Sequence, residues 1–160
     1  MTRWMSIRKA AYLSTSAIIL ILSLLVSPDA FAASIEGNKC WAVHMTQGED
    51  GPIDELVTVK THAVKIDAAT FIVTGRAIIP TDNPVTFEGT AILAGGSYVW
   101  NMTITQVQKS GKQAIGTARI SMSEKTLKGN MYNIVKRFDP STMEFDDGYR
   151  FGTIAVKACR

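Results

Sequence analysis

Apolar and polar side chains alternate along much of the chain after residue 40. The clearest stretch is SYVWNMTITQVQ, in which Tyr98, Trp100, Met102 and Ile104 occupy every second position. Because successive side chains of a β-strand point to opposite faces, this period of two predicts a strand with one buried face. No convincing helical period of apolar residues follows the N-terminal region, so the pattern favours an all-β fold.

The same alternation predicts eight strands, separated by turns rich in Gly, Pro, Asp and Ser. Short links between consecutive strands favour antiparallel neighbours in a meander. In the second strand the apolar positions shift phase near His62, from Val57 and Val59 to Val64 and Ile66, which predicts a β-bulge there. The expected strands are 40–46, 55–66, 70–79, 85–93, 97–108, 113–122, 127–138 and 149–159.

Five of these strands carry a glycine near the middle, and in at least four of them it falls on the apolar face. Glycine inside a strand often marks a sharp bend or a close approach of backbones. A row of such glycines predicts a sheet that coils tightly and closes into a single eight-stranded antiparallel up-and-down barrel without exposed edges. The five residues are Gly75, Gly89, Gly116, Gly129 and Gly152.

The N-terminal region has the layout of a secretory signal peptide. Three basic residues lie within the first nine, an apolar core follows at 17–26, and the small-residue pattern Ala-Phe-Ala occupies 30–32. The core is shorter than the roughly 20 residues of a membrane-spanning helix. We therefore predict a signal peptide over 1–32, a β-barrel domain over 33–160, a periplasmic or secreted location, and no stable membrane span after cleavage. A retained anchor is the alternative.

Cys40 and Cys159 are the only cysteines in the sequence. An even number of cysteines in an exported chain favours a disulfide, with two separate thiols as the alternative. Closure of the barrel would bring the last strand beside the first. The predicted disulfide would then clasp that seam, with both cysteines on the outer face.

Charge and motifs exclude several classes of function. Removal of the signal peptide takes three basic residues and one acidic residue from totals of 17 and 14, which leaves 14 and 13. No basic cluster remains that would favour nucleic acid. The acidic loops lack the EF-hand spacing, and neither His44 nor His62 stands in a metal or nucleophile motif. We therefore expect no metal, no cofactor and no catalytic residue, and the oligomeric state stays open.

An exported, disulfide-clasped barrel of eight strands resembles the calycin group, which includes lipocalins and avidin-like proteins. The resemblance covers the whole predicted mature chain in strand number, topology and inward glycines. Lipocalins place a G-x-W motif on the first strand, whereas three residues separate Gly37 from Trp41 here. The resemblance implies only that Trp41 closes one end of the barrel. Dirigent-like and allene-oxide-cyclase-like barrels have similar strand numbers and are alternatives.

The predicted inward positions form a bulky wall opposite a wall of glycine and alanine. This arrangement fits a filled core, or a barrel that holds one small ligand. Arginine is rarely buried alone, so Arg137 and Arg150 are expected at a rim, where they could meet an anionic head group. The residues predicted to bind a ligand are Trp41, Tyr98, Trp100, Met102, Asn133, Arg137 and Arg150.

The leading hypothesis is an exported small β-barrel that binds a small apolar or amphipathic ligand without catalysis. One alternative is a barrel enzyme of the cyclase or isomerase type, in which Tyr98 or His62 moves a proton. The other alternative is a filled barrel that acts through its surface, as an inhibitor or an envelope assembly partner.

Overall fold

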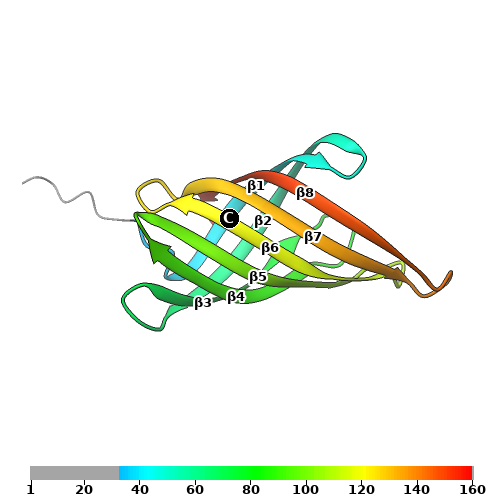
Figure 1. Ribbon diagram of the computed structural model, residues 1–160, viewed down its shortest axis with the longest axis horizontal. Helices are drawn as coiled ribbons and strands as arrows, with labels where there is room; N and C mark the ends of the chain where they lie inside the picture. Colours follow the sequence, from blue (N-terminus) through cyan, green and yellow to red (C-terminus); the bar gives the residue numbers. More distant parts are fainter. Residues whose placement is uncertain (1–32, 160) are drawn as a thin grey trace, which may run out of the picture. The chain divides into compact units, whose positions relative to one another are not determined.

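The computed structural model describes residues 33–159, in which eight antiparallel strands close into one barrel (Figure 1). Each strand pairs with its neighbours in sequence, and the last strand pairs with the first. The predicted fold class is therefore confirmed. The strands are β1 (Gly37–Gly48), β2 (Gly51–Lys65), β3 (Thr70–Ile78), β4 (Val85–Ala94), β5 (Ser97–Val107), β6 (Gln113–Ser123), β7 (Lys128–Asp139) and β8 (Glu144–Lys157).

The predicted signal peptide over 1–32 lies outside the described residues. Within residues 33–159, no helix has the length and hydropathy needed to cross a membrane.

Strand β8 begins five residues earlier than predicted, because part of the expected acidic loop belongs to the sheet. Asp146 lies opposite Arg137 of β7, and Asp147 lies opposite Lys136. Both pairs form ion pairs across the strands, with nitrogen–oxygen distances of 2.7 Å and 3.7 Å. Opposite charges on facing positions support antiparallel pairing, so these aspartates extend the hairpin rather than end it.

The β-bulge expected near His62 is wrong. Strand β2 keeps an uninterrupted register through His62, and the irregularity lies in β1 between Met45 and Gln47. The buried face of β2 continues through Thr61, whose hydroxyl accepts a hydrogen bond of 2.9 Å from Trp41 Nε1. A polar residue therefore occupies an inward position, and the apparent phase shift toward Val64 only reflects exposed apolar residues on the outer face.

All five mid-strand glycines lie where neighbouring backbones approach closely. At each of them an added Cβ would overlap a main-chain carbonyl oxygen of the adjacent strand, and only glycine, which has no Cβ, avoids this overlap. The prediction that these glycines mark a close approach of neighbouring backbones is therefore confirmed. The opposing carbonyls belong to Lys60 (for Gly75), Asn101 (for Gly89), Ile134 (for Gly116), Ser121 (for Gly129) and His44 (for Gly152).

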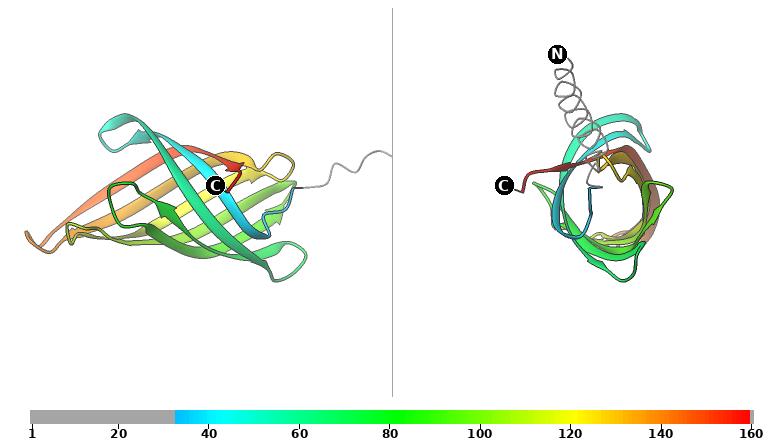
Figure 2. Two further views of the ribbon diagram at one scale, coloured as in Figure 1. Left: turned by 180° about the vertical axis from the view of Figure 1, so that it is seen from behind. Right: turned by 90° about the vertical axis from the view of Figure 1, so that its left-hand side faces the viewer.

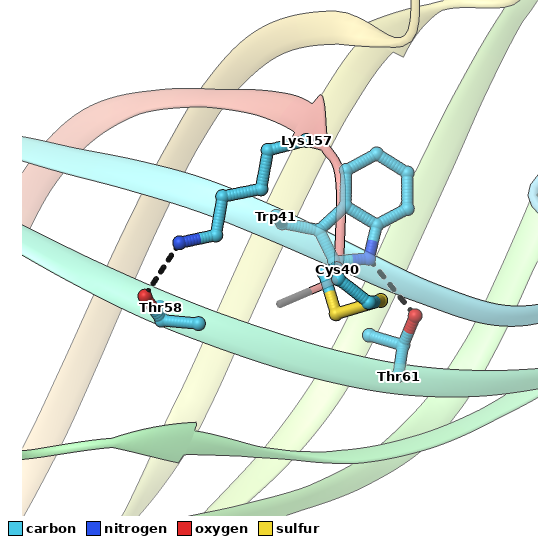
Figure 3. Close-up of a disulfide and its surroundings, with 6 residues drawn as sticks. Cys40, Trp41, Thr58, Thr61 and Lys157 are labelled. Carbon is cyan, nitrogen blue, oxygen red and sulfur yellow. Dashed lines mark hydrogen bonds between the residues drawn. A yellow bond between two sulfur atoms is a disulfide. The ribbon is translucent and has the colours of Figure 1, made fainter.

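The predicted disulfide is present and joins the two ends of the described domain (Figure 3). Cys40 in β1 bonds to Cys159, which follows β8, across a sequence separation of 119 residues. Cys40 alternates with the inward-facing Trp41, so the bond lies on the outer side of the β1–β8 seam. Nearby, Lys157 Nζ donates a hydrogen bond of 2.7 Å to Thr58 Oγ1 of β2 (Figure 3).

One end of the barrel is packed with large apolar side chains, and we call it the closed end. It is the end where β1 begins and β8 finishes. The segment before β1 lies across this end, where Ile35 is fully buried (Figure 2, right). The main-chain amide of Ala33 donates to Glu124 of the β6–β7 turn, which ties the segment down. The sequence pattern did not predict this plug, because the segment is too short to show a period.

Candidate functional site

A cavity of about 260 Å³ occupies the interior toward the opposite end, which we call the open end. All eight strands contribute lining residues, and most of them are aliphatic or aromatic. The volume lies just below the range of roughly 300–1,000 Å³ that is typical of small-molecule sites. The barrel is therefore packed at one end and hollow toward the other, with room for one small ligand.

Two tryptophans lie between the packed end and the cavity. Their rings meet edge to face, with the centroids of Trp41 and Trp100 5.3 Å apart. This geometry favours contact between the positive edge of one ring and the negative face of the other. Trp100 lines the cavity, whereas Trp41 lies behind it and is held by its bond to Thr61. The floor of the cavity thus has a rigid aromatic support.

Two polar atoms on residues that line the cavity have no hydrogen-bond partner within residues 33–159. They are Trp100 Nε1 and Asn133 Oδ1, and both atoms are fully buried. A buried donor or acceptor without a partner costs roughly 1–3 kcal/mol. Native proteins rarely leave such groups unpaired, so each calls for a partner such as a water molecule or a ligand.

The mouth of the cavity is built from ion pairs. Arg137 binds two carboxylates, Glu49 at 2.8 Å and Asp146 at 2.7 Å. Arg150 of β8 pairs with Glu55 of β2, and these two strands lie on either side of β1. Both guanidinium groups are therefore already neutralised, which argues against the expectation that they are free to meet an anionic head group.

The pKa values at the mouth reflect these contacts. A hydrogen bond from its own main-chain amide, followed by the bond from Arg137, lowers the pKa of Glu49. The hydrogen bond to Asp146 raises the pKa of Arg137, against the opposing effect of burial. Glu49 and Arg137 are therefore both charged at neutral pH.

The predicted ligand-binding residues fall into two groups. Trp100, Met102, Asn133, Arg137 and Arg150 line the cavity. Trp41 and Tyr98 are buried in the same apolar core but are not among the residues that line the cavity.

Tyr98 packs edge to face against Phe71, with ring centroids 5.7 Å apart, and burial raises the pKa of its phenol. It therefore stays protonated at neutral pH. His44 and His62 face outward and bind Asp54 and Asn38. Neither Tyr98 nor His62 is among the described residues that line the cavity, so the geometry does not favour a proton-transfer role for either.

Sequence reasoning missed the acidic side of the mouth. Glu55 shares the inward parity of Val57 and Val59, so the alternation in β2 contained the signal that could have found it. Glu49 lies in the two-residue turn between β1 and β2, and no pattern predicts its approach to Arg137. Among residues 33–159, no group of three or more His, Cys, Asp or Glu side chains is arranged to hold a metal ion.

The outer face of β7 and β8 carries a band of aromatic side chains. Tyr132 and Phe151 lie on facing positions with ring centroids 4.5 Å apart, and Phe138 and Phe145 form a second pair at 4.8 Å. Phe145 is largely exposed. These rings point away from the cavity, so substitutions can address the two surfaces separately.

Comparisons with known proteins identify similar folds only. No protein-family model and no curated protein matches the sequence. The solved structure described as "EF1p2_mFAP2b bound to DFHBI" is 16% identical over 77% of this chain and 94% of that chain, with a TM-score of 0.45. The redesigned β-barrel mFAP1 bound to DFHBI is 17% identical over 77% and 94% of the two chains, with a TM-score of 0.41. The redesigned barrel b11L5F_LGL is 15% identical over 78% and 92%, also with a TM-score of 0.41. The calycin resemblance stays a prediction.

Proposed function

We propose that this protein is an exported β-barrel that binds one small, predominantly apolar molecule in its interior and performs no chemistry on it. The cavity is the observation that carries the proposal. It combines apolar walls, a few polar groups and one packed end, which is the usual anatomy of a small-molecule site. Trp100 and Met102 supply aromatic and thioether contact to the ligand, and Trp41 supports Trp100 from behind.

The export part of the proposal rests on the N-terminal sequence pattern and on the disulfide. Structural disulfides persist mainly in oxidising compartments, so the Cys40–Cys159 bond supports a periplasmic or secreted location. The mature chain is expected to begin at Ala33. Mass spectrometry of the exported protein tests this, and an intact N-terminus would contradict it.

Filling the cavity tests the binding proposal directly. Ala118 lies on the inward face of β6 and lines the cavity, so Ala118→Leu places extra methyl groups in the ligand's space. Thr117→Leu is the matched control, since it introduces the same side chain at the next position on the exposed face of the strand. Trp100 and Trp41 report binding by fluorescence when a panel of neutral aromatics, quinones and medium-chain fatty acids is titrated.

At least one compound of the panel is expected to change tryptophan emission at micromolar concentration. Ala118→Leu should weaken that binding tenfold or more, because overpacking displaces the ligand, while Thr117→Leu should leave it unchanged. Gly116→Leu is unsuitable, because its Cβ would collide with the carbonyl of Ile134 and disturb the fold itself. Equal binding to both leucine variants, or no binding by any compound, would argue for a protein that acts through its outer surface.

A further inference from the structure

We propose that the cavity selects an uncharged ligand with a hydroxyl group, which accepts a hydrogen bond from Trp100 and donates one to Asn133. This inference rests on the proposed function and specifies the ligand class of the same site. It follows from the two unpartnered polar atoms and from the charges at the mouth.

The contrast between the two tryptophans shows that an unpaired indole N–H is not a general feature of this core. Trp41 Nε1 donates to Thr61 at 2.9 Å, whereas Trp100 Nε1 has no partner among the described residues. Trp100 is 1% exposed and Asn133 is 9% exposed, so bulk water does not serve either group. The indole N–H of Trp100 and the amide oxygen of Asn133 therefore have no partner among the described residues, whereas Thr61 supplies one for Trp41.

The strand register relates the backbone positions of Trp100 and Asn133, which lie on either side of β6. Trp100 lies opposite Ile120, and Met102, two residues further along β5, lies opposite Ala118. Ala118 in turn lies opposite Asn133 of β7. Trp100 and Asn133 are thus separated by two strand spacings of about 4.8 Å and one two-residue step of about 6.8 Å. Both residues line the same cavity of about 260 Å³.

The donor and acceptor types define the group that fits. An indole N–H can only donate, so the ligand must present an acceptor to Trp100. The unpaired Asn133 atom is the carbonyl oxygen, which accepts, so the ligand must also present a donor. A hydroxyl combines one O–H donor with acceptor lone pairs. A phenol or an alcohol on an apolar ring system therefore complements both atoms with a single group.

The charges at the mouth disfavour an anionic ligand. Arg137 is shared between Glu49 and Asp146, and Arg150 is paired with Glu55. A carboxylate ligand would have to displace one of these pairs, or enter the apolar interior without a counter-ion at a large desolvation cost. A neutral hydroxyl avoids both costs.

Three probes with the same ring system separate the contributions of the apolar body, the hydroxyl group and a negative charge at pH 7. Naphthalene carries only the apolar body, 2-naphthol adds a neutral hydroxyl, and 2-naphthoate adds a negative charge. Calorimetric titration is expected to give 2-naphthol an affinity about tenfold higher than naphthalene, equal to about 1.4 kcal/mol. 2-Naphthoate should bind at least tenfold more weakly than 2-naphthol. Hydration opposes the burial of a hydroxyl, so a preference for 2-naphthol requires hydrogen bonds inside the site.

Trp100→Phe removes the indole N–H, and Asn133→Leu replaces the whole side-chain amide by an apolar group of similar size. Each is expected to reduce the tenfold preference for 2-naphthol over naphthalene to about twofold or less, with naphthalene binding retained. Met131→Leu is the matched control, because it alters the shape of the same cavity without changing a polar group. It should shift the affinities for naphthalene and 2-naphthol together and leave their ratio unchanged.

The outcomes distinguish this inference from the proposed function. If naphthalene and 2-naphthol bind the wild-type protein equally well, only water serves the two polar atoms, and the hydroxyl inference fails while ligand binding stands. Tightest binding by 2-naphthoate would overturn the neutral-ligand inference alone. If none of the three probes binds and Ala118→Leu has no effect on any ligand, the proposed function fails as well. Thermal melting of each variant checks that it folds, and either polar variant by itself suffices for the comparison.

Discussion

The closed end of the barrel is packed with large, fully buried side chains, whereas the open end is lined by partly exposed ion pairs. At the closed end Trp41, Phe71 and Met122 are each at most 3% exposed. At the open end the side chains of Arg150 and Glu55 are 40% and 39% exposed. The same eight strands run through both ends, so the difference arises from side chains rather than from topology.

This contrast indicates how the protein separates stability from binding. Apolar burial is the main favourable contribution to folding, and the closed end has the larger share of fully buried side chains. The disulfide lies on the same side of the molecule, where β8 finishes. The open half leaves a cavity unfilled and stabilises its rim with charge pairs, which contribute little when they are exposed. We therefore expect substitutions at the closed end to change stability and those at the open end to change binding.

Truncation of the central tryptophan should have the largest effect. Trp41→Ala removes a fully buried ring, its contact with Trp100 and its bond to Thr61, so we expect a loss of about 3–5 kcal/mol in the free energy of unfolding. Arg150→Ala at the open end should cost less than about 1 kcal/mol, because the ion pair it removes is well exposed. Urea unfolding monitored by circular dichroism measures both. Similar losses in the two variants would contradict the division between the ends.

The same substitution, glycine to alanine, can be compared at one position near each end of the barrel. An alanine at Gly129, near the closed end, would place its Cβ against the carbonyl of Ser121, so Gly129→Ala should cost about 3 kcal/mol. At Gly148, near the open end, the nearest atoms belong to the flexible guanidinium of Arg137, at 3.2 Å. Gly148→Ala should therefore change stability by less than about 1 kcal/mol. A mild effect at Gly129 would mean that β6 and β7 can separate there without loss.

The disulfide is expected to have an intermediate effect. Replacement of Cys40 and Cys159 by serine releases a loop of more than a hundred residues, for which we expect a loss of about 2–4 kcal/mol. The variant should remain a folded β-rich protein, because the packed end and the strand pairing are unchanged. Comparison of the melting temperatures of the two forms tests this. Complete unfolding at room temperature would show that the closed end depends on the covalent bond rather than on packing.

Acidification should produce the smallest effect, and it should act at the open end. Hydrogen bonding holds the pKa of Glu49 below its unfolded value, so its contribution to stability is present at neutral pH and is lost as the pH falls through the lowered pKa. Stability should therefore decline as the pH falls below the ordinary range of a glutamate. Glu49→Gln should remove part of that decline and cost less than about 1 kcal/mol at pH 7. A pH profile identical to that of the wild-type protein would exclude the Glu49–Arg137 pair as a contributor.

Much of the fold was predictable because it depends on local patterns. Alternating side chains predicted the strands, since the two faces of a β-strand meet different environments. The inward glycines predicted the tight coiling, because only a residue without a Cβ permits such close backbone contact. The start of β8 was mispredicted, since Asp146 and Asp147 resemble turn residues until their partners on β7 are known.

The candidate site was predictable only in part. Parity alone identified Trp100, Met102 and Asn133 as inward residues, and all three line the cavity. The same parity could not distinguish Trp41 and Tyr98, which face inward and are buried but do not line the cavity. Depth along the barrel axis depends on which side chains of other strands share the same level, and that information is absent from any single strand.

The sequence by itself determined the strand pattern, the close approach of backbones at the glycines and the residue types that face inward. These features follow from the geometry of one strand and from the size of individual side chains. Only the tertiary structure decided that the barrel is plugged by Ile35, that Arg137 and Arg150 are neutralised, and that Trp100 and Asn133 share one cavity without partners. These features depend on distances between residues far apart in the chain, and such distances exist only once all eight strands have closed.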